Sequence, residues 1–84
     1  MDWPQQYCAA LERRIGRALG LSDNEVDSVL DLARDIAHAT ERRFAPLSAY
    51  VTGKFVAARV GEGVSPEAAL EEALTTDQSF RSIM

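Results

Sequence analysis

The chain has 84 residues, of which 46% are apolar and 26% are charged, and its net charge at pH 7 is −4. This length predicts one domain, residues 1–84, and the composition is that of a folded protein rather than a disordered one. The acidic balance argues against nucleic-acid binding, because that affinity comes largely from neutralising phosphates.

The cysteine content and the apolar runs bear on the compartment. Cys8 is the only cysteine, so a disulfide within the chain is excluded, which fits a reducing environment. The first residues show no basic stretch followed by an apolar run, and no apolar run approaches the roughly 20 residues that a membrane span needs. We therefore expect a cytoplasmic protein with no membrane contact.

The first predicted helix covers about residues 3–19. Large apolar residues recur there at helical spacing, with Asp2 as the expected N-cap and Gly20 as the expected terminator. The recurring residues are Trp3, Tyr7, Leu11, Ile15 and Leu19.

The second predicted helix covers about residues 23–42. Ser22 and Glu25 have the spacing of a capping box. An apolar set at helical spacing follows, with acids early and basic residues late, as the helix macrodipole favours.

The third predicted helix, about residues 46–60, is the centre of the expected fold. It is apolar almost all the way round, which is typical of a helix surrounded by others. A strand is the rival interpretation, and it is rejected because the sequence offers no second strand to pair with it. The other three helices would cover this one, so we expect a monomer or at most a weak dimer.

The fourth predicted helix covers about residues 66–74, after the breaker Gly61-Glu62-Gly63 and the start signal Ser65-Pro66-Glu67. The remaining residues form either a short helical turn, which Thr75-Thr76-Asp77 would cap, or a frayed tail. The predicted fold is all-α: a compact bundle of four main helices with the third in the middle.

Five polar residues are the candidate binding site, as a small-molecule or anion site: Arg34, Asp35, His38, Arg42 and Lys54. His38 is the only histidine, and its flank of the second helix carries charges of both signs. A metal site is not expected, because the ligand spacing of known sites is missing. The main interpretation of this flank is a set of solvated ion pairs, with His38 bridging its helix to residues 44–47.

Catalytic residues are not identified, and no cofactor is expected. Cys8 lies on the apolar face of the first helix, so a buried, inert thiol is the expected state. Lys54 has apolar neighbours, which leaves three alternatives: an ammonium extended into water, an ion pair with another helix, or an anion contact. No acid–base pair with a required spacing is present, so the chain is not expected to be an enzyme.

Ala49, Gly53 and Ala57 form one stripe of small side chains down the third helix. Glycine inside a helix costs about 1 kcal/mol relative to alanine, so Gly53 calls for a compensation. We predict that the stripe packs internally against Ala33 and Ala37 of the second helix. The alternative is that it forms the floor of a groove for an outside helix or ligand.

The segment Leu30–His38 (LDLARDIAH), followed by Arg42 and the run Ala45-Pro46-Leu47, resembles a small actinobacterial family of helical domains of unknown function. The resemblance covers about residues 3–74 and departs at Arg43, where the family often has proline. It implies a domain found alone or attached to nucleotidyltransferase-like enzymes of molybdenum-cofactor synthesis. No nucleotidyltransferase motif is present in this sequence, so the resemblance implies a pathway rather than an activity.

Two hypotheses follow. The first is a non-enzymatic helical module that binds an unidentified protein partner, with a molybdenum-cofactor enzyme or a second copy as candidates. Aromatic residues are favoured interface anchors, and the candidates are Trp3, Tyr7 and Phe44. The alternative is a small-ligand or anion-binding domain that uses Arg34, His38, Arg42 and Lys54.

Overall fold

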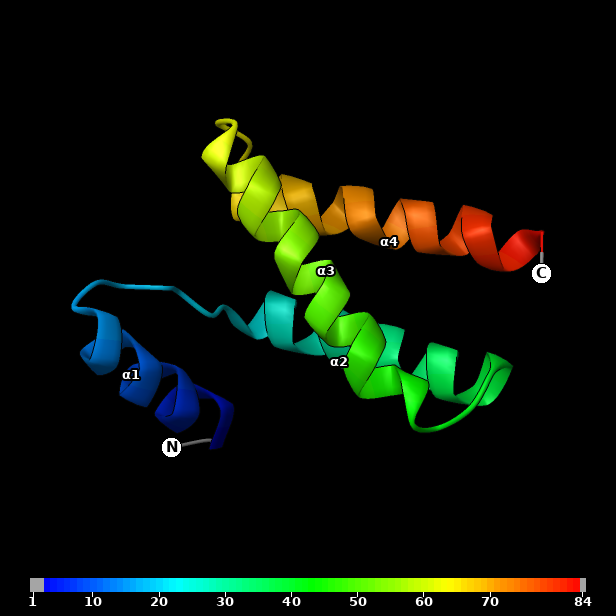
Figure 1. Cartoon of the computed structure of the whole chain (residues 1–84), viewed down its shortest axis with the longest axis horizontal. Helices are drawn as coiled ribbons and strands as arrows, with labels where there is room; N and C mark the ends of the chain where they lie inside the picture. Colours follow the sequence, from blue (N-terminus) through cyan, green and yellow to red (C-terminus); the bar gives the residue numbers. More distant parts are fainter. Residues whose placement is uncertain (1–2, 84) are drawn as a thin grey trace.

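The computed structural model describes residues 3–83, and these form four α-helices with no strand among them (Figure 1). The helices are α1 (Trp3–Ile15), α2 (Asp23–Ala39), α3 (Phe44–Gly61) and α4 (Pro66–Ser82). The predicted all-α bundle is therefore confirmed. None of these four helices is long and apolar enough to cross a membrane. The expected N-cap, Asp2, lies outside the described residues.

The start of α2 is the one predicted from the sequence. The Ser22 hydroxyl accepts a hydrogen bond from the Glu25 amide at 3.1 Å, and the Glu25 carboxylate accepts one from the Ser22 amide at 2.7 Å. This is the predicted capping box. The helix ends at Ala39 rather than at residue 42. There the Thr40 amide and the Thr40 hydroxyl both donate to the Ile36 carbonyl, at 2.9 and 2.7 Å.

The bounds of α3 and α4 differ from the prediction. Helix α3 begins at Phe44, before Pro46, because a proline in the first turn removes no hydrogen bond that the helix would make. The expected end of α4 at residue 74 is wrong, since the helix continues to Ser82. The Thr76 hydroxyl donates to a carbonyl of its own helix, and Arg81 pairs with Asp77 at 2.9 Å, so this polar stretch stays helical.

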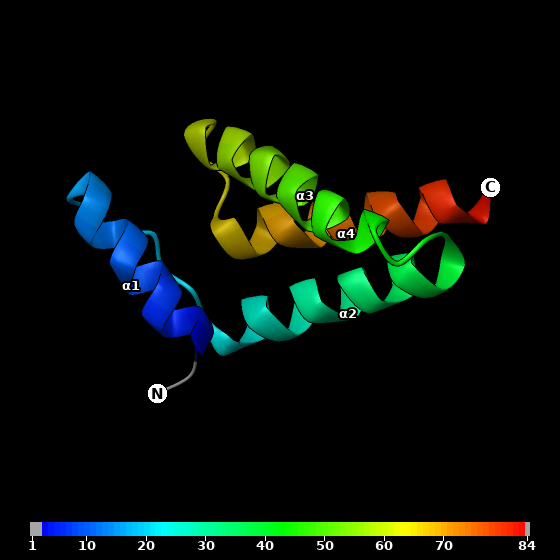
Figure 2. The ribbon, with the colours of Figure 1, turned by 60° about the horizontal axis from the view of Figure 1, so that its bottom comes forward.

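Helix α3 is the middle element of the bundle. It packs along both α2 and α4, whereas α2 and α4 contact each other only briefly (Figure 2). The buried residues come from the two outer helices: Leu32 and Ile36 of α2, and Ala69 and Leu70 of α4. No residue of α3 is buried, so its central position is not matched by coverage on all sides.

Helix α1 stands beside the bundle. The predicted end at residue 19, with Gly20 as the terminator, is wrong: α1 ends at Ile15, because Gly16 takes a positive φ of 76°. A linker of residues 16–22 leads to α2. Within residues 3–83, α1 makes no extensive contact with another helix, and none of its residues is buried. The prediction that α1 helps to cover α3 is therefore wrong. The radius of gyration is accordingly 13.5 Å, where a compact domain of this length would have about 12 Å.

Candidate functional site

The apolar face of α1 is open to solvent. Trp3 is 69% exposed and Tyr7 is 53% exposed, and their rings stack with centroids 5.1 Å apart. Leu11 and Ile15 continue the same row and are also exposed. Because these residues are spaced by four, they form one ridge on the helix surface. Trp3 and Tyr7, two of the predicted interface residues, are thus accessible to a partner.

The linker after α1 is tied to the end of that helix. The Glu12 carboxylate accepts hydrogen bonds from the amides of Leu19 at 2.8 Å and Gly20 at 3.2 Å. These two bonds lower the pKa of Glu12, because they favour its charged form. Gly16 and Gly20 both have positive φ, which lets the linker turn back on itself. The direction in which α1 leaves the bundle is therefore fixed by specific bonds.

An open apolar groove lies between the linker and α3. Its volume is about 800 Å³. Its floor is a row of small residues on α3, spaced by four, and its walls include two linker leucines and apolar residues of α2 and α4. The floor residues are Ala49, Gly53, Ala57 and Gly61, and the wall residues include Leu19, Leu21, Val29 and Leu70.

The groove overturns the prediction that the small stripe packs internally. A Cβ atom placed on Gly53 would have no heavy atom within 4 Å, apart from those of its own helix and chain neighbours. The stripe therefore faces open space rather than the alanines of α2. The physical reason is the position of α1, which does not cover this side of α3.

A second exposed surface lies along α3, on residues that were predicted to lie in a central, covered helix. Leu47, Tyr50 and Val51 are each more than half exposed. The Lys54 ammonium lies 5.4 Å from the centre of the Tyr50 ring, in a cation–π contact. Of the three alternatives for Lys54, an ammonium extended over an apolar neighbour and into solvent describes this geometry best.

The five polar candidates are not brought together as a site. Arg34 pairs with Asp31 of its own helix at 3.0 Å, and Asp35 lies 3.9 Å from Arg81 of α4. Among residues 3–83, no hydrogen bond or ion pair links any two of the five candidates to each other. These candidates are Arg34, Asp35, His38, Arg42 and Lys54.

His38 and Phe44 also differ from expectation. The His38 side chain is exposed and makes no hydrogen bond within the described part of the chain, so the expected bridge to residues 44–47 is missing. Phe44 is half-buried at the start of α3, with the Arg43 guanidinium 5.2 Å from its ring centre. It is therefore less available to a partner than Trp3 and Tyr7.

Cys8 is half-buried on α1 rather than fully buried. Partial removal from water and the nearby Glu12 carboxylate both raise the pKa of its thiol. A thiol of this kind stays protonated at neutral pH and is a weak nucleophile.

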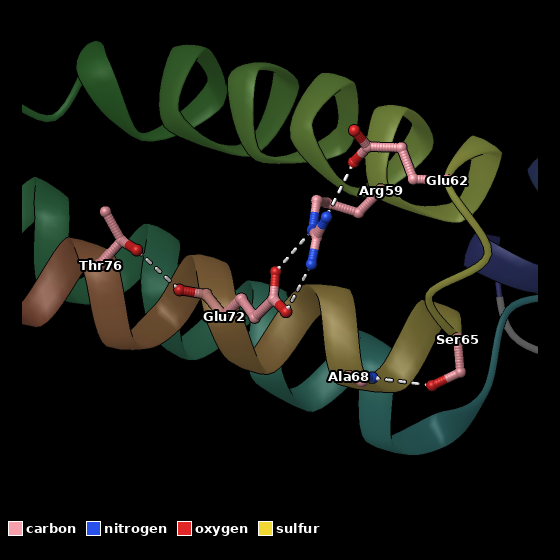
Figure 3. A network of polar contacts seen from close by, with 6 residues as sticks. All are labelled: Arg59, Glu62, Ser65, Ala68, Glu72 and Thr76. Atoms are coloured by element: carbon pink, nitrogen blue, oxygen red, sulfur yellow. Dashed lines mark hydrogen bonds and ion pairs between the residues drawn. The ribbon is translucent and has the colours of Figure 1, made fainter.

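A polar junction that sequence reasoning missed holds the end of α3 against α4 (Figure 3). The Arg59 guanidinium donates to both oxygens of Glu72, at 2.9 and 3.1 Å, and to Glu62 at 2.8 Å. These bonds raise the pKa of Arg59 and lower that of Glu72. Because two carboxylates already occupy Arg59, the junction is suited to fixing one end of the groove rather than to binding an anion.

The comparisons with known proteins add a family but no function. No curated protein matches this chain, and no solved structure matches it. A family model described as "Domain of unknown function (DUF6457)" matches residues 1–81. That match covers nearly the whole sequence, and the chain therefore belongs to this family of unknown function.

Proposed function

We propose that this chain is a non-enzymatic helical module that binds another protein chain through apolar surface. The observation that carries the proposal is the amount of surface left uncovered. The accessible area is 6,322 Å², whereas a compact monomer of 9.2 kDa would expose about 4,900 Å² by size scaling. Large apolar residues of α1 and α3 are exposed, and large exposed apolar patches mark interaction sites.

Two side chains that could carry catalysis lack the surroundings that catalysis needs. His38, the only imidazole, has no hydrogen-bond partner among residues 3–83 that would orient it as a base. Cys8 has a raised pKa, so its thiol is not activated as a nucleophile. Both observations support a binding role rather than an enzymatic one.

The resemblance to domains attached to molybdenum-cofactor enzymes suggests the guanylyltransferase-like enzyme of that pathway as one candidate partner, in the cytoplasm. The alternative of an anion site gains no support, because Arg34 already pairs with Asp31 and Lys54 lies over the Tyr50 ring. An anion site would need these cations to converge on one pocket.

The test is binding by purified proteins, compared between wild type and two charged variants, Tyr7→Lys and Val51→Lys. Both residues are exposed, so the fold should survive the change. Isothermal titration with candidate partners, and with the chain itself by dilution, should show binding that one or both variants weaken. The matched control is Gln6→Lys, next to Tyr7 and also exposed. If the wild type binds no protein chain at concentrations up to about 100 μM, the proposed function is wrong.

A further inference from the structure

Two surfaces that no other part of residues 3–83 covers have the same four-residue spacing. One is the ridge of α1, formed by Trp3, Tyr7, Leu11 and Ile15, and the other is the groove on α3, with its floor of small residues. We propose that the groove takes α1 of a second copy, and that the exchange is reciprocal, so that two copies form a symmetric dimer. This inference rests on the proposed function and names the partner: another copy of the same chain.

The spacing of the two rows supports this pairing. The large residues of α1 and the small residues of the groove floor both recur every four positions. Rows of this spacing have the same inclination on a helix, so a ridge of one helix fits between the ridges of another at a crossing angle of about −50°. The small floor residues let the two backbones approach closely, and Gly53 leaves open space where a side chain can enter.

Charge also favours α1 as the occupant. Helix α1 carries two arginines and one glutamate, whereas residues 20–84 carry eleven acidic and six basic residues. A helix of net positive charge would therefore approach an acidic body, and the groove wall itself carries one charge of each sign, Arg17 and Glu25. Complementary charge of this kind steers association and opposes the approach of an acidic helix.

The excess accessible area of each copy is large enough for the interface of a stable dimer. The accessible area exceeds that of a compact monomer by about 1,400 Å² for each copy. A standard protein–protein interface buries about 800 Å² on each partner, and obligate homodimers bury more. Reciprocal docking of two α1 helices would use two copies of the same interface, as a two-fold symmetric dimer requires.

The geometry favours the α1 of another copy over the chain's own α1. The linker itself forms part of the groove wall through Leu19 and Leu21, and Glu12 ties that linker to the end of α1. In both ribbon views only the N-terminal end of α1 lies near the start of α2, and α1 does not run along α3 (Figures 1 and 2). Where α1 approaches α2, the side-chain oxygen of Gln5 is shielded from solvent without a partner among the described residues, so this contact is not well satisfied.

The first test is the mass of the full chain in solution by sedimentation equilibrium. We expect a dimer of the 9.2 kDa chain at tens of micromolar. Gly53→Leu fills the groove and Tyr7→Lys charges the ridge, so each should raise the dimer dissociation constant by about tenfold or more. Both changes lie at open positions, so the folded chain should persist, which circular dichroism can check.

Gly53→Ala and Gln6→Lys are the matched controls and should leave the dissociation constant within about threefold of wild type. Alanine at position 53 only extends the row that Ala49 and Ala57 already form. A monomeric wild type at these concentrations would overturn the inference. So would a dimer that neither Gly53→Leu nor Tyr7→Lys weakens.

The second test separates exchange between copies from closure within one chain. In a Cys8→Ser background, one chain carries Leu11→Cys and another carries Gly53→Cys, and the two are mixed under mild oxidation. Exchange predicts a mixed disulfide between the two chains. A third chain carries both substitutions. A disulfide that forms only within this doubly substituted chain, and not between the two singly substituted chains, would overturn the exchange. A monomer that binds a different protein would also overturn the exchange, yet it would leave the proposed function standing.

Discussion

Helices α1 and α2 have similar sequence patterns but different surroundings. Both carry apolar residues at helical spacing, and both are flanked by charges. Yet Leu32 of α2 is 4% exposed, whereas Leu11 of α1 is 41% exposed. An amphipathic pattern therefore shows that a helix has an apolar face to cover, but it does not show which surface covers it.

The difference comes from the connections that follow the two helices. A short turn joins α2 to α3, and short connections place neighbouring helices against each other. The longer linker after α1 contains Gly16 and Gly20 at positive φ, and it turns back toward α1 through the bonds to Glu12. Local bonds at the linker thus decide the position of α1, because no core contact among residues 3–83 does.

The largest expected effect is on the free energy of unfolding, and it comes from the buried residues of α2. Leu32→Ala should lower the free energy of unfolding by about 2–5 kcal/mol, because it leaves a cavity among buried side chains. Leu11→Ala should lower it by less than about 0.5 kcal/mol. Urea unfolding at sub-micromolar protein, where any dimer dissociates, measures both. Equal losses would mean that α1 is packed as tightly as α2.

The second expected effect concerns how α2 begins. Ser22→Ala removes the side-chain acceptor for the Glu25 amide and should cost about 1 kcal/mol of stability. Ser22→Asn keeps an acceptor at the same place and serves as the control. Thermal melts of the two variants should therefore separate. Indistinguishable melts would show that packing alone sets the start of α2.

The third expected effect has the opposite sign and tests the vacant side of α3. Gly53→Ala should raise the stability of the isolated chain by up to about 1 kcal/mol, because alanine is the better helix former. Gly53→Leu should also be at least as stable as wild type, since its side chain enters open space. This reverses the overpacking expected from an internal stripe. A clear loss of stability in the dilute monomer would mean that another helix already fills the groove.

The smallest expected effect is the pH response of the linker. The pKa of Glu12 is lowered in the folded chain by the amides of Leu19 and Gly20, so these bonds stabilise the folded linker at neutral pH. Their contribution is complete above the ordinary glutamate pKa and is lost as the pH falls through the lowered value. Amide hydrogen exchange of Leu19 and Gly20, corrected for its intrinsic pH dependence, should lose protection in that range. Glu12→Gln should show less protection already at neutral pH, with no further acid-induced loss.

The sequence predicted the local features well, because those features depend on neighbouring residues. The capping box of Ser22 and Glu25, the start of α4 at Pro66 and the all-α class are all confirmed. The ends of α1 and α2 and the bounds of α3 and α4 were less accurate. Proline at position 46 fits inside a first turn, and polar residues such as Thr76 can satisfy their hydroxyls on the helix itself.

The features that depend on tertiary contacts could not be predicted in the same way. The Arg59–Glu72 pair joins two helices at a separation of thirteen residues, which no helical period reveals. The open groove depends on the path of residues 16–22, and that path is set by two bonds to Glu12. The candidate site based on His38 followed mainly from one face of α2, and the structure brings only Arg81 of α4 near it, 3.9 Å from Asp35, without joining the candidates to one another.

The order of the packed helices has a consequence for the time course of folding. The extensive contacts join α2 to α3 and α3 to α4, and each pair is adjacent in sequence. Bringing such neighbours together closes only short loops, so residues 23–82 should fold within microseconds to milliseconds. Burial of Trp3 by a second copy would have to follow as a slower step whose rate rises with protein concentration. A refolding trace followed by the fluorescence of Trp3, the only tryptophan, would therefore report when two chains meet rather than when one chain folds.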